Sequence, residues 1–111
     1  MQTAKSITKG IRVPPRKARL AADLIRGLKV EDATSQLLVS SLKAGKLLEK
    51  TLRSAVANAE TQLGLRREEL IVQEVRVDAG PVLKRSKSKS KGGRAPIMKR
   101  TSHFTIVVAT N

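Results

Sequence analysis

The chain has 111 residues, which is enough for one domain with one modest hydrophobic core. It contains no cysteine and a single aromatic residue, so disulfides, cysteine-ligated metal centres and thiol chemistry are excluded, and a large cofactor pocket would be hard to line. Its 23 lysines and arginines against 9 acidic residues give a formal net charge of +14, which favours a polyanionic partner such as nucleic acid.

The first expected element is a short strand over residues 3–9, where polar and apolar residues alternate loosely, as on a sheet edge. Pro14 and Pro15 then suit the entry to a helix, where an amide hydrogen would have no partner. Behind them, apolar residues at spacings of three and four predict a first helix that ends near Gly27. The apolar stripe consists of Ala18, Ala21 or Ala22, Ile25 and Leu28.

A second, shorter helix is expected over residues 31–38, with Ala33, Leu37 and Leu38 facing inward. The third helix has the most regular pattern in the chain; a serine, either Ser40 or Ser41, caps its start, and Gly64 ends it. Its wide apolar face consists of Ala44, Leu47, Leu48, Leu52, Ala55, Val56, Ala59 and Leu63. Because much of this face is alanine, another element can approach the helix closely.

In the last third of the chain the apolar period changes from 3.6 to 2, which predicts strands over residues 70–78 and 102–110. The residues expected on the inner side are Ile71, Val75 and Val77 in the first strand, and Phe104, Ile106 and Val108 in the second. Neighbouring strands of this kind usually pair antiparallel. The predicted fold is therefore α+β, a single domain over residues 1–111 in which a small three-stranded antiparallel sheet is covered on one face by three helices.

The positive charge is concentrated at the two ends of the chain. Residues 1–30 have a net charge of +7, residues 31–78 of −1, and residues 79–111 of +8. The middle of the sequence therefore has the charge balance of an ordinary globular protein, and the two ends are expected to contact the polyanion.

The connector between the last two strands, KRSKSKSKGGRAPIMKR at residues 84–100, carries eight cations and no carboxylate. It is too long for a hairpin turn, and its lysine–serine alternation also fits a solvated, disordered loop. Apolar residues at both ends, the central Gly92 and Gly93, and basic pairs on both flanks favour instead a long protruding β-hairpin over residues 79–102. Arms of roughly nine residues would reach about 30 Å beyond the body. Such a ribbon is marginal in water, so we expect it to be ordered inside a phosphate-lined partner.

The chain has no Trp or Tyr on which bases could stack, and no helix-turn-helix, zinc-finger or basic-zipper pattern. Lysine, arginine and serine side chains that contact phosphates and hydroxyl groups are suited to recognising a folded RNA by its shape. One alternative is a DNA-architectural protein with β-ribbon arms, which would need a second apolar face for a dimer. The other is an RNA-modifying enzyme, for which we find no glycine-rich cofactor loop, carboxylate pair or nucleophile–base set.

Four stretches, PRKARLAADLIRGLKV, SAVANAE, VDAGPVLKR and KGGRAPIMKRTSHFTIVV, occur in the order and spacing of bacterial-type large-subunit ribosomal protein twenty-two. The chain resembles this family over nearly its whole length. The resemblance implies a structural, non-enzymatic constituent of the large ribosomal subunit that binds large-subunit (23S-type) ribosomal RNA and aids early assembly. It also implies that the globular part lies near the polypeptide exit and that the hairpin lines the nascent-peptide exit tunnel.

The implied partners are ribosomal RNA, other large-subunit proteins and the nascent peptide, with no cofactor, metal or small-molecule substrate. No run of eighteen apolar residues and no apolar signal segment occurs, so we expect a ribosomal location in the cytoplasm, or in the plastid stroma of an organelle, without a membrane span.

The resemblance and the charge pattern together predict which residues contact RNA. They are Arg12, Arg16, Lys17, Arg19, Arg26, Lys84, Arg85, Lys87, Lys89, Lys91, Arg94, Lys99, Arg100, Thr101, Ser102 and His103. The hairpin tip nearest the tunnel is expected to consist of Gly92, Gly93, Arg94 and Ala95.

Two other polar residues have simple expected roles. His103, the only histidine, has no neighbours at metal-ligand spacing, so a hydrogen bond to RNA or to sheet-edge neighbours is expected. Asp23 lies among arginines of the first helix and is expected to pair with Arg16, Arg19 or Arg26.

Overall fold

The structure, a computed structural model, describes the backbone of residues 2–88 and 94–110, and side chains within these ranges except in residues 85–88 and 94–97. The elements in chain order are β1 (Thr3–Ile11), α1 (Pro15–Asp23), α2 (Val30–Val39), α3 (Lys43–Leu63), the 3-10 turn η1 (Arg67–Glu69), β2 (Leu70–Ala79), β3 (Leu83–Ser88), β4 (Arg94–Lys99) and β5 (Ser102–Thr110).

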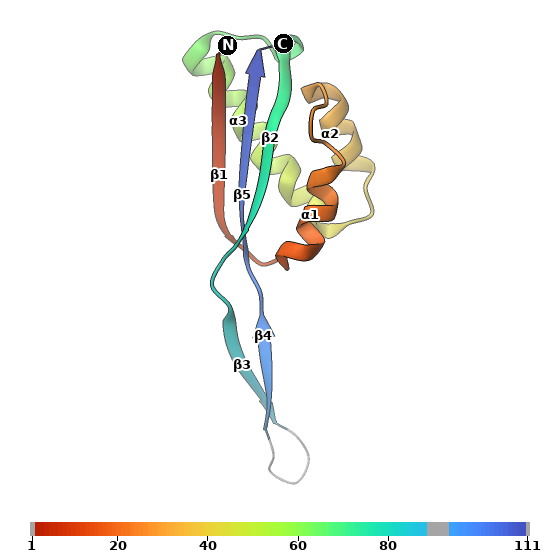
Figure 1. Ribbon diagram of the computed structural model, residues 1–111, viewed down its shortest axis with the longest axis vertical. Helices are drawn as coiled ribbons and strands as arrows, with labels where there is room; N and C mark the ends of the chain where they lie inside the picture. Colours follow the sequence, from red (N-terminus) through yellow and green to blue (C-terminus); the bar gives the residue numbers. More distant parts are fainter. Residues whose placement is uncertain (1, 89–93, 111) are drawn as a thin grey trace.

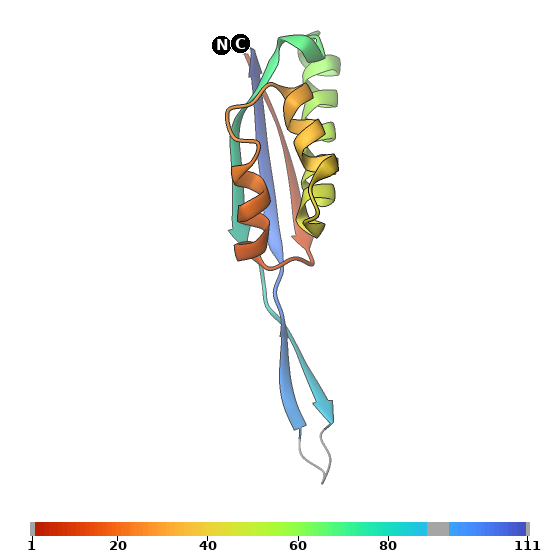
Figure 2. The same ribbon diagram turned by 90° about the vertical axis from the view of Figure 1, so that its right-hand side faces the viewer.

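The strands form two antiparallel sheets, one with the order β1-β5-β2 and the other a ribbon of β3 and β4. The three helices cover one face of the larger sheet, with α3 packed over β1 and β5 and α1 beside β2 (Figures 1 and 2). The ribbon, which we call the arm, projects from one end of the body (Figure 1). The predicted α+β fold with a protruding hairpin is therefore confirmed.

The arm makes the molecule elongated. Its extents are 62 × 25 × 16 Å and its radius of gyration is 16.9 Å, against about 13 Å for a compact chain of this length. The hydrophobic core lies between the larger sheet and the helices, and its largest fully buried side chain is Phe104 on the central strand β5. The inner face of β5, which is Phe104, Ile106 and Val108, is buried as its alternation predicted.

Strand β2 contains a bulge that its sequence pattern did not reveal. Val72 pairs with Val108 and Glu74 pairs with the neighbouring Val107, so Gln73 is an extra residue that has no position opposite it on β5. An inserted residue reverses which side chains face the core. Leu70 and Val72 are consequently buried before the bulge and Val75 and Val77 after it, whereas Ile71 is only partly buried. The prediction that Ile71 faces inward is wrong for this reason.

Helix α1 ends at Asp23, several residues before the predicted end at Gly27. Gly27 adopts a left-handed backbone conformation (φ 83°), and its amide donates to the Val72 carbonyl at 3.0 Å. The Val72 amide in turn donates to the Leu28 carbonyl at 2.8 Å. The chain leaves the helix early because these residues pair with the edge of β2, while Ile25 still reaches the core.

Two further details of the helices differ from the sequence prediction. Leu38 is 56% exposed, because the buried stripe of α2 is Val30, Ala33 and Leu37. The N-cap position of α3 is held by Leu42 without a side-chain cap, and the Ser40 hydroxyl accepts the Leu42 amide hydrogen instead. The predicted serine cap is therefore wrong, whereas Gly64 does end α3 in the left-handed conformation expected of it.

The arm joins the body through an irregular root, because Gly80–Val82 on the outgoing side faces only Arg100 and Thr101 on the returning side. The Gly80 amide donates to the Thr101 carbonyl at 2.9 Å. The Thr101 hydroxyl donates to the Pro81 carbonyl at 2.6 Å, and the Ser102 hydroxyl donates to the Val13 carbonyl at 2.6 Å. These bonds hold the two sides of the root together, and hold the root to the β1–α1 connection, where the hydrogen bonds between strands are interrupted.

Replacing Gly80 by alanine should loosen this root. An added Cβ would lie 2.5 Å from the Thr101 hydroxyl oxygen and 3.0 Å from Cε1 of His103, so the threonine must turn away from the Pro81 carbonyl. We expect a loss of about 1–3 kcal/mol in the free energy of unfolding, the cost of leaving the partners of this partly buried hydrogen bond unsatisfied. Urea denaturation followed by circular dichroism measures it.

The Thr101→Ala background is the control for this prediction, because it removes the hydroxyl that the new Cβ would meet. Gly80→Ala should cost less there than in the natural sequence, which is a coupling that a double-mutant cycle detects. Equal costs in both backgrounds would contradict the proposed clash.

Candidate nucleic-acid interface

Helices α1 and α3 both begin at the end of the body from which the arm projects, whereas α2 begins at the opposite end (Figure 2). Acidic residues usually occupy a first helical turn, because they complement the positive end of the helix dipole. α2 follows this rule with Glu31 and Asp32, but the first turns of α1 and α3 contain no acid and neither helix has a side-chain cap. The arm end of the body therefore presents two uncompensated positive helix ends.

Three surface grooves meet around the arm root, and cations line all of them. The first lies between α1 and the root, the second between β4 and the start of α3, and the third between the β1–α1 connection and α3. Their cations, which we call the arm-root collar, are Arg12, Arg16, Lys17, Arg19, Lys43, Lys99 and Arg100.

Neighbouring grooves of the collar share residues: Arg100 lines the first and second grooves, and Lys43 lines the second and third. No carboxylate is among the described residues that line them. Seven cations around the arm root, close to two helix starts, create a positive potential that suits phosphate groups, whose oxygens accept hydrogen bonds from lysine and arginine.

The sequence is similar to known proteins over almost its whole length. The profile of the family described as Ribosomal protein L22p/L17e matches residues 6–109, which is most of the chain. The chain belongs to this ribosomal protein family. Proteins described as "Large ribosomal subunit protein uL22" are 70% identical in Protochlamydia amoebophila, over 98% of each chain, and 64% identical in Chlamydia pneumoniae, over 94% of each chain. Another, from Chlamydia trachomatis serovar L2, is 60% identical over 94% of each chain.

In this L22p/L17e protein, two of the predicted RNA-binding arginines also bind the edge strand β2. Arg19 donates from Nε and Nη2 to the Val77 carbonyl at 3.3 and 3.2 Å, and Arg26 donates from Nη2 to the Val75 carbonyl at 2.9 Å. Arg26 also pairs with Asp23 at 2.7 Å, which confirms an arginine partner for that carboxylate. Arg19 still lines a collar groove, whereas Arg26 is not among the residues lining the collar grooves.

Three other predicted residues of the L22p/L17e chain lie at the arm root and serve the fold. Thr101 and Ser102 are 4% and 0% exposed with their hydroxyl groups donated to backbone carbonyls, so neither side chain is accessible to a partner in this structure. His103 is partly buried, and its Nδ1 accepts the Gly10 amide hydrogen at 3.0 Å. This is the sheet-edge hydrogen bond that was one of the two roles expected for the histidine.

The remaining predicted residues of the L22p/L17e protein belong to the arm. Lys84 on β3 and Lys99 at the end of β4 are exposed, as is Arg100 just beyond it. The backbone of β3 includes Arg85 and Lys87, and that of β4 includes Arg94 and Ala95. Lys89, Lys91, Gly92 and Gly93 lie outside the described residues, as therefore does the predicted turn at the two glycines.

Sequence reasoning missed Lys43, which completes the collar of this L22p/L17e protein. The charge count of residues 31–78 is nearly neutral, so this segment gave no reason to look for a cationic surface. A usable signal was the first turn of the third helix, which contains lysine and no acid.

Within the part of the chain that the structure describes, no three His, Asp or Glu side chains are grouped so that they could hold a metal ion. No helix among the described residues is long and apolar enough to cross a membrane.

Proposed function

We propose that the protein is a structural constituent of the large ribosomal subunit, and that it binds large-subunit ribosomal RNA through the arm-root collar and the arm. Membership of the L22p/L17e family and the similarity to large ribosomal subunit proteins support the ribosomal role. The collar itself supports RNA as the ligand. Seven cations from separate parts of the chain meet at one end of the body, with no carboxylate among the described residues of their grooves.

The collar can do more than attract a polyanion. Arg12, Lys17 and Lys43 belong to the body, whereas Lys99 belongs to the arm and Arg100 to its root. An RNA backbone in these grooves would therefore hold the arm against the body. Arginine forks and lysine ammonium groups at fixed positions also set the register of the RNA, since phosphate contacts orient a nucleic acid without reading its sequence. Such shape-directed binding suits early assembly, when the subunit RNA is being folded.

The arm needs surroundings that its own body does not supply. An isolated two-stranded ribbon is marginal in water. The arm and its root also expose apolar groups: Met98 on β4 is 54% exposed, and Val82 in the root is 36% exposed. A wall of RNA and protein would cover both the cations and these apolar groups. We propose, as the family resemblance implies, that the body lies near the polypeptide exit and that the arm lines the nascent-peptide exit tunnel with its tip, Gly92 to Ala95, toward the peptide.

A competition filter-binding experiment tests the proposed RNA ligand. Labelled, structured fragments of large-subunit RNA and duplex DNA of equal length compete for the protein at several salt concentrations. We expect a preference for the RNA, and a slope of log affinity against log salt of about −5 to −6 if all seven collar cations meet phosphates. Equal affinities would favour the DNA-architectural alternative, and a slope near zero would contradict a collar that binds phosphates.

A further inference from the structure

Beside the arm-root collar, α3 carries a further groove whose residues come from the turn before the helix and from its first two turns. Its lining consists of Ser40, Ser41, Leu42, Lys43, Lys46, Leu47 and Lys50. Lys43, Lys46 and Lys50 are three and four positions apart, so they lie on one face of the helix. We call this surface the α3 lysine groove.

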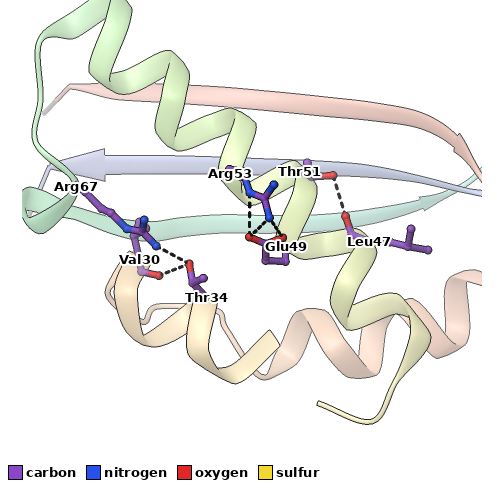
Figure 3. Close-up of polar contacts among 7 residues, drawn as sticks. All are labelled: Val30, Thr34, Leu47, Glu49, Thr51, Arg53 and Arg67. Atoms are coloured by element: carbon purple, nitrogen blue, oxygen red, sulfur yellow. Dashed lines mark hydrogen bonds and ion pairs between the residues drawn. The ribbon is translucent and has the colours of Figure 1, made fainter. Parts of the chain in front are cut away.

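The three lysines have no compensating acid in the described part of the chain. None of them makes an ion pair or a side-chain hydrogen bond among the described residues. The nearest carboxylate on the helix, Glu49, is 7% exposed, and Arg53 donates to both of its oxygens, from Nη2 at 2.9 and 2.7 Å and from Nε at 3.1 Å (Figure 3). Like charges three and four residues apart repel each other, so an anion bound in the groove would relieve this repulsion.

The groove also has the surface of a site for a phosphate backbone. Leu42 and Leu47 are partly buried and supply the apolar part of the lining. Ser40 and Ser41 also line the groove. The Ser40 oxygen accepts the Leu42 amide hydrogen at 3.2 Å, which leaves its hydroxyl hydrogen able to donate. Hydroxyl and ammonium donors around one groove match the oxygens of a phosphodiester.

The α3 lysine groove is continuous with the collar. It shares Leu42 and Lys43 with the third collar groove, and Lys43 also lines the second groove beside Arg100. Along α3, the distance from Lys43 to Lys50 is about 10 Å at a rise of about 1.5 Å per residue. Because the cationic path runs on beyond the collar, it fits an extended polyanion better than a single small ion.

We propose that Lys43, Lys46 and Lys50 form a second contact surface for ribosomal RNA, along which a phosphate backbone continues from the arm-root collar over the start of α3. This inference rests on the proposed function, because its ligand is a further segment of the same RNA. The charge pattern of the sequence did not reveal this surface.

The double substitution Lys46→Gln/Lys50→Gln tests this inference, since both residues lie in the α3 lysine groove and outside the collar. Filter binding of a structured large-subunit RNA fragment should show a salt slope reduced in magnitude by about 1.4–1.8, and an affinity at 0.1 M salt reduced about 30-fold. Hydroxyl-radical footprinting of the RNA should show one protected segment lost and the collar segment retained.

The matched control is Lys5→Gln/Lys29→Gln, which removes the same two charges from exposed positions on β1 and just before α2. An equal loss of affinity in this control would overturn the inference, because net charge alone would then explain the effect. If Lys46→Gln/Lys50→Gln left affinity and footprint unchanged while collar substitutions still weakened RNA binding, only the inferred RNA contact of the α3 lysine groove would be overturned. Insensitivity of RNA binding to both sets would overturn the proposed function as well.

Discussion

The triple substitution Arg16→Gln/Lys17→Gln/Arg100→Gln should weaken binding of structured large-subunit RNA by about two orders of magnitude at 0.1 M salt. All three side chains are exposed and line the groove between α1 and the arm root. Each lost phosphate contact lowers the magnitude of the salt slope by about 0.7–0.9, which corresponds to about five- to eightfold in affinity at 0.1 M. Filter binding over a salt series measures both quantities.

The control for this experiment is Lys29→Gln/Arg66→Gln/Arg67→Gln, which also removes one lysine and two arginines. These residues are exposed and belong to the segments that lead into α2 and β2, outside the collar grooves. Its affinity should fall far less than that of the collar variant, because only the weaker long-range attraction is lost. A loss of similar size in the two variants would contradict a localised interface.

Phe104→Ala should destabilise the body by about 3–5 kcal/mol. Phe104 is fully buried on the central strand, and truncation removes its apolar surface and leaves a cavity. Domains of this size have a free energy of unfolding of about 5–15 kcal/mol, so the variant would lose between about one fifth and all of its stability. Urea denaturation followed by circular dichroism, at salt high enough to screen the net charge, measures the change.

Two variants accompany this measurement. Phe104→Leu keeps most of the apolar volume and should cost clearly less than the alanine variant. Val39→Ala removes apolar atoms from a side chain that is 81% exposed, and its effect should stay within about 0.5 kcal/mol. A cost below about 1 kcal/mol for Phe104→Ala would contradict the position of this ring at the centre of the core.

Most of the fold could be predicted from local patterns, because the elements that cover the core repeat their apolar residues at helical or strand spacing. The errors occur where a distant part of the chain decides the local structure. Helix α1 ends early because Gly27 and Leu28 pair with Val72, which is far away in the sequence. Ile71 turns away from the core because of a bulge that becomes visible only in the pairing with β5.

The candidate interface, too, could be predicted only in part, because the fold decides which charged and polar groups lie together on the surface. Charge counts identified the cations at both ends of the chain, and the structure brings Arg12, Arg16 and Arg100 together at the arm root. Charge counts cannot tell which polar groups the fold itself uses: Ser102 is buried, although Lys99 and Arg100 shortly before it are exposed. Nor can they show that α3 begins beside the arm, which adds Lys43 to the collar.

The arginine contacts on β2 have a consequence for the free protein before assembly. Strand β2 is one edge of the larger sheet, and an edge with unpaired carbonyls is a template on which a strand from another copy can add. Arg26 occupies the Val75 carbonyl and Arg19 the Val77 carbonyl, while Gly27 and Leu28 bond to Val72. These bonds leave fewer free carbonyls on this edge, so a strand from another copy has less to pair with there.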